Sequence, residues 1–427
     1  MKKVLLIGFL WPYLGGSKRV IGLANHLEEF SWQPNILTAP LQKRPPDHLR
    51  IIQTGYRGIL GRGARLLGLD EKAPVGEQVK ERIRGLSPGS MAILRWGSDM
   101  FREVYAYPDE HKGWIPYALS SADEFIRREK CDALLSIWPY SSHLIAQELK
   151  KRHGLPWIAD LADLWSDNSA YPYGRIRKWF DTRLEKRTLG DADTLMTSSG
   201  PLAERLAWIH PQKKIGVNII GFDPDIMNTP PKSLGKQFTI IYTGVFYWKK
   251  RDPYPFFKAL SELRAENKVQ PGDLEVHVYG PDQGWVQQEI RELSVGEIVK
   301  QFPSIPYQDC IEKQRESHVL LQLNWNDVNE RGVFSGKLLD YLAAGRPILA
   351  AGGSGNDDVV IEILRKTGAG VYAVSVEEIK AAILRFIEEY RKTGTLVYRG
   401  QWKEVEKYSN REMAKTYARN LNLILGN

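Results

Sequence analysis

FSGKLLDYLAAGRPILA, residues 334–350, predicts a turn of small residues, a short helix and a buried strand. Ser335 and Gly336 open the helix, Lys337 lies in its first turn, and Gly345 ends it. The apolar residues after Pro347 are of the kind found in strands inside parallel sheets. The stretch therefore predicts one helix-to-strand step of an α/β fold.

Lys337 and Asp340 predict a site for a phosphorylated sugar at the start of this helix. A helix N-terminus presents free N–H groups and a partial positive charge, and an added lysine suits a diphosphate. Asp340 follows one turn later and can accept hydrogen bonds from a sugar or ribose diol. A Lys–Asp pair in an ordinary helix is the alternative. A P-loop is excluded, because Leu338 stands where that motif needs serine or threonine.

The same stretch resembles the donor-site segment of the family 4 retaining glycosyltransferases, in the subgroup with an S-[GK]-K-L-x-[DE]-Y pattern. The resemblance covers nearly the whole chain. It implies the α/β fold called GT-B, in which two Rossmann-like domains face a central cleft and a C-terminal helix crosses back to the first domain. Gly332 stands where many members carry a sugar-contacting glutamate, so that role has no carrier here. The donor-binding residues that the resemblance implies in this stretch are Ser335, Gly336, Lys337, Leu338 and Asp340.

The composition indicates a globular protein of two domains. Its 427 residues exceed what one core normally supports, and 43% hydrophobic with 26% charged residues is ordinary for folded proteins. The net charge of +8 favours anionic partners. Nucleic acid is not expected among them, because the basic residues are scattered and no recognised module is present. Cys131 and Cys310 lie far apart, which argues against a disulfide framework and favours a reducing compartment.

The N-terminal stretch predicts a first strand, Val4 to Phe9, rather than a signal peptide. Its apolar run is short, is interrupted by Pro12 and lacks a small-residue cleavage site. No run of about 20 apolar residues that could span a membrane is present. We expect a cytoplasmic protein, and the sequence leaves open a peripheral position on the inner face of the cell membrane.

Strands and helices alternate regularly in two parts of the chain. The first series runs from Ala133 to Pro201, after an irregular region from about Leu41 to Pro116. A second series begins with FTIIYTG, residues 238–244. We expect an acceptor-binding domain over residues 1–226 and a nucleotide-sugar-binding domain over 227–400. A final helix from about Trp402 to Leu425, within residues 401–427, is expected to pack back on the first domain.

Gly15, Gly16 and Ser17 form a turn after the first predicted strand. Paired glycines let a backbone approach a ligand closely, and Ser17 suits a helix N-cap. Turns of this kind are common in α/β proteins, so a purely structural turn is the alternative. The resemblance places the turn at the cleft, with the two glycines toward the donor and Ser17 on the acceptor side.

Polar residues follow several strands of the first series. Ligands of parallel sheets bind outside the carboxyl ends of the strands, so these residues are site candidates. Asp160 and Asp163 lie where PWIA runs into a loop, and we assign Asp163, and next Asp160, to the acceptor or the transition state. A helix cap or a salt bridge to the following basic helix is the alternative. His143 is an acceptor-side candidate, with a core or capping histidine as the alternative. Ser141 and Ser198 complete the set.

Two basic segments can meet a membrane. GYRGILGRGARLLGLD, residues 55–70, interleaves arginines with leucine and isoleucine, and the helix expected from Arg175 to Leu189 carries six basic residues. Such segments can lie on an anionic membrane and meet a lipid-linked acceptor. A solvated insertion and a solvated helix face are the alternatives, and dense glycines argue against a stable helix in the first segment.

A second anion cradle is expected after the strand that ends at Gly244. In the family, an arginine and then a lysine hold the donor diphosphate at this place. Val245 takes the place of the arginine, so one of three following cations must substitute. The resemblance adds Gly280, at the end of the next strand, and Tyr307, against the nucleotide base. The three cations are Lys249, Lys250 and Arg251.

The resemblance implies transfer of a sugar from a nucleoside-diphosphate sugar, of the UDP or GDP type, with retention at the anomeric carbon. The acceptor expected is a glycan or a lipid-linked precursor of a surface polysaccharide. Neither a cofactor nor a metal is expected, and no cluster with metal-ligand spacing occurs in the sequence. The catalytic task of Lys337 is to stabilise the departing diphosphate. The alternatives are a nucleotide-sugar epimerase or hydrolase, and a non-catalytic nucleotide-sugar-binding protein. The latter is favoured by Gly332, by Val245 and by Ile220, which stands where the family carries an asparagine before Gly-Phe-Asp.

Overall fold

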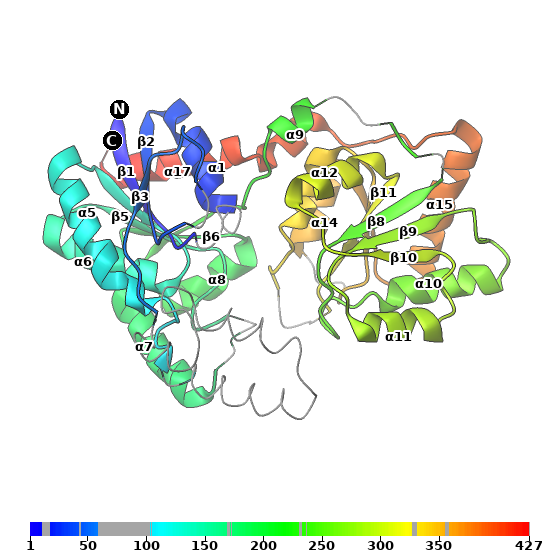
Figure 1. Ribbon diagram of the computed structural model, residues 1–427, viewed down its shortest axis with the longest axis horizontal. Coiled ribbons are helices and arrows are strands. Elements are labelled where there is room, and N and C mark those ends of the chain that lie inside the picture. The colour runs from blue at the N-terminus through cyan, green and yellow to red at the C-terminus, as the bar shows by residue number, and fades with distance from the viewer. Residues whose placement is uncertain are drawn as a thin grey trace. The chain divides into compact units, whose positions relative to one another are not determined.

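The computed structural model describes residues 1–10, 18–41, 44–58, 103, 105–168, 171, 173–229, 233–235, 237–326, 331–354 and 358–426. The chain divides into two compact units. Unit 1 consists of residues 1–220 and 410–427, and unit 2 of residues 221–409. Each unit is a parallel sheet covered by helices, and the two sheets are drawn with their element labels in Figure 1. Together they make two Rossmann-like domains.

Unit 1 contains a seven-stranded sheet in the order β3-β2-β1-β4-β5-β6-β7. The chain builds one side of the sheet from β1 to β3 and the other from β4 to β7, so the order reverses between β1 and β4. Its strands are β1 (Lys2–Ile7), β2 (Trp32–Thr38), β3 (Ile51–Gln53), β4 (Ala133–Ser136), β5 (Trp157–Leu161), β6 (Thr194–Thr197) and β7 (Lys214–Val217). Its helices are α1 (Lys18–His26), η2 (Leu27–Phe30), η3 (Lys112–Trp114), α5 (Ile115–Glu129), α6 (Tyr140–His153), α7 (Arg175–Leu189), α8 (Gly200–Ile209) and α17 (Asn410–Ile424).

Unit 2 contains a six-stranded sheet in the order β10-β9-β8-β11-β12-β13, which reverses between β8 and β11. Its strands are β8 (Thr239–Thr243), β9 (Glu275–Tyr279), β10 (Val299–Phe302), β11 (Val319–Leu323), β12 (Ile348–Ala351) and β13 (Gly370–Ala373). Its helices are α9 (Asp225–Asn228), α10 (Tyr254–Ala265), α11 (Gly284–Glu292), α12 (Tyr307–Glu316), α13 (Lys337–Ala344), α14 (Asp358–Thr367), α15 (Val376–Thr393), α16 (Trp402–Val405) and η4 (Glu406–Tyr408).

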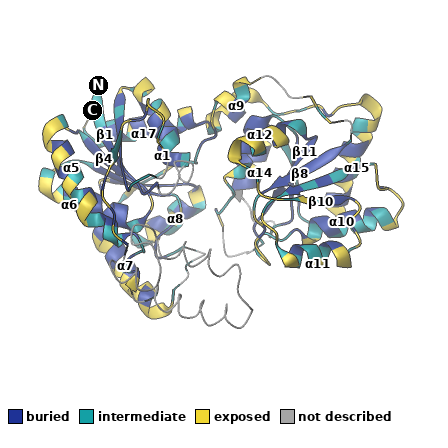
Figure 2. Cartoon of the chain, in the orientation of Figure 1, coloured by how far each residue is buried: buried dark blue, intermediate teal, exposed yellow. Residues whose placement is uncertain are grey.

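The central strands of both sheets are buried, whereas the helices bury one face and expose the other (Figure 2). Strands covered on both faces need continuous apolar runs, which explains the sequences VLLI in β1 and TIIYT in β8. The order 3-2-1-4-5-6 of the second sheet is that of dinucleotide-binding folds, in which ligands bind where the order reverses. In unit 2 that place is the carboxyl ends of β8 and β11.

The last helix of the chain belongs to unit 1. Met413, Tyr417 and Leu421 of α17 are buried in the core formed by β1, β2 and α1. The two helices come close at Gly22, where a Cβ atom would lie 2.5 Å from the Asn410 side chain. The expected continuous helix from Trp402 to Leu425 is wrong in one respect, because Ser409 is extended and separates η4 from α17.

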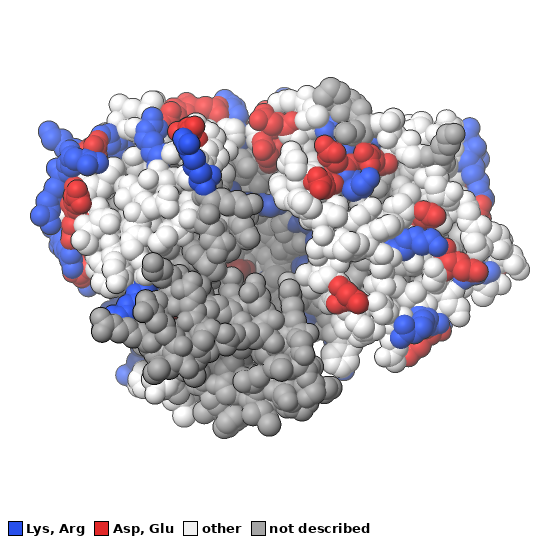
Figure 3. Space-filling model, in the orientation of Figure 1, with Lys and Arg blue, Asp and Glu red and all other residues white. Residues whose placement is uncertain are grey.

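Two short strands, β3 and β10, are absent from the sequence-based prediction. The segment before α5 packs into unit 1. Asp109 accepts hydrogen bonds from the Ser141 backbone N–H and hydroxyl, both at 2.7 Å, and so holds the start of α6. Within the described part of the chain, no helix is both long and apolar enough to cross a membrane. On the face drawn in Figure 3, acidic and basic side chains of unit 2 lie interspersed.

Candidate functional site

Lys337 is the first residue of α13, directly after Gly336. Its Nζ is buried and has no hydrogen-bond partner among the described residues. The nearest ring is that of Tyr242, whose centroid lies 3.7 Å from Nζ. Burial lowers the pKa of Lys337 well below its ordinary value, and the charge of Arg251 lowers it further. The Lys337 amine is therefore buried without a hydrogen-bond partner among the described residues, and the nearby charges of Arg251 and Asp340 act on its pKa in opposite directions.

The glycines that end β8 and β9 leave room for this lysine. Gly244 has φ 123°, and a Cβ atom there would lie 2.9 Å from Lys337 Nζ. A Cβ atom on Gly280 would lie 2.4 Å from the Gly244 carbonyl oxygen. The Gly244 N–H donates to the Tyr279 carbonyl at 2.7 Å, which fixes the two strand ends side by side. Both positions thus require glycine for a close approach.

The three expected cations occupy a tight turn closed by the Arg251 N–H, which donates to the Tyr247 carbonyl at 2.7 Å. Lys249 has φ 58° and is exposed beside Trp248. Lys250 Nζ lies 5.2 Å from the centroid of the Trp325 ring. Arg251 is the one whose charge acts on Lys337, and its Nε is buried with no hydrogen-bond partner among the residues that the structure describes. The geometry therefore favours Arg251 as the second cation.

Trp325 is a site residue that the sequence analysis missed. It follows β11, is 9% exposed, and its Nε1–H is buried with no acceptor within the described part of the chain. The Arg251 guanidinium lies 5.5 Å from its ring centroid. Trp325 and Gly244 thus follow the two strands between which the sheet order reverses. The sequence feature that could have indicated this residue is a tryptophan, whose indole N–H is a hydrogen-bond donor, just after the carboxyl end of an apolar strand.

Asp340 and Tyr307 contact each other. The Tyr307 hydroxyl donates to Asp340 Oδ1 at 2.9 Å, and Asp340 is buried while the tyrosine ring is about half exposed. Burial raises the pKa of Tyr307, and the adjacent Asp340 raises it further. Leu338 is buried, and its N–H donates to the Ser335 carbonyl at 3.0 Å. Leu338 therefore offers a ligand no polar group of its own, and the exposed Gly336 lies nearer the surface.

Asp160 of unit 1 lies in a buried polar network. The Arg19 guanidinium donates to Asp160 Oδ1 at 3.0 Å, to the Tyr417 hydroxyl at 2.8 Å and to the Asn218 carbonyl at 3.1 Å. Burial raises the pKa of Asp160, and the charge of Arg19 opposes that rise. The network joins α1, β5 and α17. Its geometry favours the salt-bridge alternative for Asp160, with Arg19 as partner rather than the basic helix.

Asp163 lies in the loop directly after β5 and is exposed. The surrounding protein raises the pKa of its carboxyl group by desolvation, and Arg19 opposes the rise. His143 is buried, its Nδ1 lies 2.7 Å from Ser136 Oγ, and burial lowers its pKa to about 3. That environment favours the core histidine over an acceptor contact. The Ser198 hydroxyl donates to the Ala162 carbonyl at 2.8 Å.

Gly15, Gly16 and Ser17, together with the basic residues Arg62 and Arg65, lie outside the described residues. Their predicted roles stay predictions. No group of three or more His, Cys, Asp and Glu side chains that could hold a metal ion occurs in the described part of the chain.

Residues 15–217 match the glycosyl transferase 4-like domain. This glycosyl transferase 4-like domain contains Asp160, Asp163 and His143, whereas the Lys337 site lies beyond it, in unit 2. No protein with curated function matches the chain in sequence.

Solved structures share the fold over the full length. Sucrose-phosphate synthase from Thermosynechococcus elongatus is 12% identical, with a TM-score of 0.60 over 100% of both chains. A glycosyltransferase from Rickettsia africae is 12% identical, with a TM-score of 0.58 over 100% of this chain and 99% of the other. WaaG, a glycosyltransferase involved in lipopolysaccharide biosynthesis, is 13% identical, with a TM-score of 0.52 over 100% of both chains. These likenesses show the GT-B fold.

Proposed function

We propose that this chain is a retaining glycosyltransferase that takes its sugar from a nucleoside diphosphate bound in unit 2. The observation that carries the proposal is the buried Nζ of Lys337, for which the described part of the chain offers no hydrogen-bond partner. Arg251 Nε and Trp325 Nε1–H are likewise buried and find no partner in the described residues, and all three groups are donors. Buried donors are normally satisfied. A diphosphate is a ligand whose oxygens can satisfy several such donors at once.

The chemistry follows from where charge develops. Breaking the glycosidic bond to the diphosphate leaves negative charge on the leaving oxygen. Lys337, Arg251 and the N-terminus of α13 are fixed positive groups that can stabilise this charge without reorganisation. Removing one such group typically costs about 3 kcal/mol, or two powers of ten in rate. We assign contact with the acceptor or the oxocarbenium-like centre to Asp163, because it is exposed at the end of β5.

The acceptor that we propose is a glycan on a lipid carrier. Support comes from the glycosyl transferase 4-like domain and from the shared fold with WaaG, a glycosyltransferase involved in lipopolysaccharide biosynthesis. A uridine or guanosine diphosphate sugar is the proposed donor. Neither a metal nor a cofactor has a step in the proposed reaction.

The test is release of nucleotide from a panel of uridine, guanosine, thymidine and adenosine diphosphate sugars, with and without lipid-linked glycan acceptors. We expect release from one nucleotide class that depends on acceptor, and a product whose anomeric configuration, measured by NMR, equals that of the donor. Conversion of the donor without acceptor would indicate an epimerase or hydrolase. Tight binding without release under any acceptor would indicate a nucleotide-sugar-binding protein and would refute the transferase.

A further inference from the structure

Helix α7 exposes charge of one sign only. Its two acids, Asp181 and Glu185, are 1% and 0% exposed. Asp181 accepts a hydrogen bond from Arg177 at 3.0 Å, and Glu185 accepts one from the Ser166 N–H at 3.0 Å. Arg177 is also buried, where it donates to the Ala106 carbonyl at 2.8 Å. The exposed charged side chains of α7 are therefore all basic, namely Arg175, Lys178, Arg183, Lys186 and Arg187.

None of these five cations forms an ion pair with any residue that the structure describes. Elsewhere exposed lysines do find acids, such as Lys407 with Glu404 at 2.7 Å and Lys415 with Glu412 at 3.1 Å. On α7 the guanidinium of Arg183 instead lies 3.7 Å from the centroid of the Trp179 ring. The described residues therefore supply no anionic partner to this face.

The same face carries large apolar side chains near its first turns. Ile176 is 78% exposed, and Trp179 and Phe180 are each 50% exposed. The outer side of α7 accordingly belongs to the exposed class in Figure 2. Adjacent apolar side chains exposed together mark an interaction surface rather than ordinary exterior. A soluble polyanion would leave them in water, whereas a lipid surface would not.

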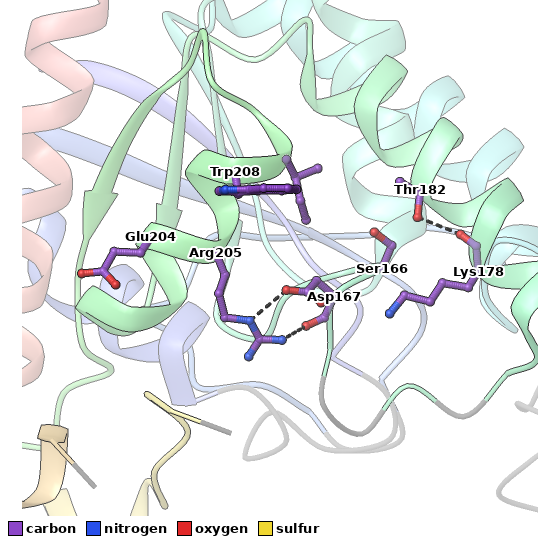
Figure 4. A pocket seen from close by; sticks show the side chains of 8 residues that line it. Ser166, Asp167, Lys178, Thr182, Glu204, Arg205 and Trp208 are labelled. Carbon is purple, nitrogen blue, oxygen red and sulfur yellow. Dashed lines mark hydrogen bonds and ion pairs between the residues drawn. The ribbon is translucent and has the colours of Figure 1, made fainter. Parts of the chain in front are cut away.

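A hollow on α7 combines both features. It has a volume of about 460 Å³ and no carboxylate among the described residues that line it, which are Arg175, Lys178, Trp179, Thr182, Arg183 and Lys186. The neighbouring pocket between α7 and α8, of about 470 Å³, shares Lys178 and Thr182 with it. In that pocket Arg205 is already bound to Asp167 at 2.8 Å (Figure 4). Its Trp208 is 90% exposed. The cationic charge available to a ligand is therefore on the α7 side.

We propose that α7 docks on a membrane surface that contains anionic phospholipid. The hollow receives a headgroup phosphate, and Ile176, Trp179 and Phe180 enter the interfacial layer of the bilayer. Basic residues near an anionic leaflet attract it, and aromatic residues settle at the headgroup level. The proposal concerns attachment and does not rest on the proposed transfer reaction.

The experiment is co-sedimentation of the full chain with vesicles of phosphatidylcholine alone or with 30% phosphatidylglycerol, without any nucleotide sugar. We expect binding to the anionic vesicles only, and loss of binding at 1 M salt, where charges are screened within about 3 Å. A variant with Arg175, Lys178, Arg183 and Lys186 changed to Gln should bind at least about 100-fold more weakly. Trp179→Ser with Phe180→Ser should weaken binding about 10-fold or more while keeping every charge.

The matched control removes four exposed cations from unit 2, namely Arg365, Arg385, Lys392 and Lys403, each changed to Gln. It should bind vesicles like the wild type. Circular dichroism of each variant establishes that it is folded, and the apolar double variant provides a second test if the charge variant is not. Equal binding to both vesicle types, or equal loss in the control, would overturn the proposal. So would release of the protein by 10 mM inorganic phosphate, or a preference for single-stranded DNA over vesicles.

Discussion

Arg19 in unit 1 and Lys337 in unit 2 are both buried cations, but their surroundings differ. Arg19 has a carboxylate, a tyrosine hydroxyl and a backbone carbonyl within 3.1 Å. Lys337 Nζ has a ring face and a second cation near it, and no acceptor among the described residues. A buried charge that serves the fold is paired inside the protein. One that is left unpaired costs stability and indicates a ligand that supplies the partner.

Arg19→Met should produce the largest effect, because it leaves Asp160 buried without its counter-charge. The expected loss is about 3 to 5 kcal/mol in the free energy of unfolding of unit 1. Urea unfolding followed by circular dichroism measures it. The control is Arg50→Met, which removes an exposed ion pair with Glu28 and should cost less than about 1 kcal/mol. Equal losses in the two variants would show that the network does not carry the stability assigned to it.

Arg251→Gln should lower the rate of nucleotide release about 100-fold, since it removes a cation next to the leaving diphosphate. Its stability should not fall, because the change relieves the repulsion of Lys337. Lys249→Gln, in the same turn but exposed, should change the rate less than about 5-fold. Equal rate losses would remove the distinction between the two cations.

Trp325→Phe keeps an aromatic ring beside Arg251 and removes only the indole N–H. If that N–H bonds the diphosphate, donor affinity should fall about 10-fold, as for a hydrogen bond to a charged group. Trp325→Leu, which also removes the ring face, should lose more. Isothermal titration with the preferred nucleotide measures both. An unchanged affinity in Trp325→Phe together with a loss in Trp325→Leu would leave Trp325 only a role in positioning Arg251.

Donor binding should take up a proton. The pKa of Lys337 is below its ordinary value in the free protein because of burial and Arg251, and a bound diphosphate should raise it again. Between the lowered and the ordinary pKa, affinity therefore falls as the pH rises. In the same window the free protein gains stability with pH, because its unfolded state binds more protons. Titration calorimetry in buffers of different ionisation enthalpy measures the uptake, and no uptake at any pH would contradict a charged contact with Lys337.

The sequence predicts local features well and distant pairings poorly. The turn, helix and strand of residues 334–350 follow from spacing, and the structure confirms α13 with Gly345 in the left-handed conformation at its end. Gly244 was expected for its place after an apolar strand. The Arg19–Asp160–Tyr417 network was not predictable, because Asp160 and Tyr417 lie 141 and 398 residues from Arg19 in the sequence. The hydrophobic periodicity of the last helix also did not predict its interruption at Ser409, because that interruption depends on how the chain returns to unit 1.

The most direct test of the account is the thermal stability of the wild type and Lys337→Met, each alone and with uridine, guanosine, thymidine or adenosine diphosphate. Lys313→Met, an exposed lysine paired with Glu316, is the control. A ligand at 100 times its dissociation constant adds about 2.7 kcal/mol to stability. We predict that one nucleotide stabilises the wild type and the control, that Lys337→Met melts at the same or a higher temperature when free, and that it gains nothing from the nucleotide. A free variant that melts lower, or one that the nucleotide stabilises as much as the wild type, would contradict the account.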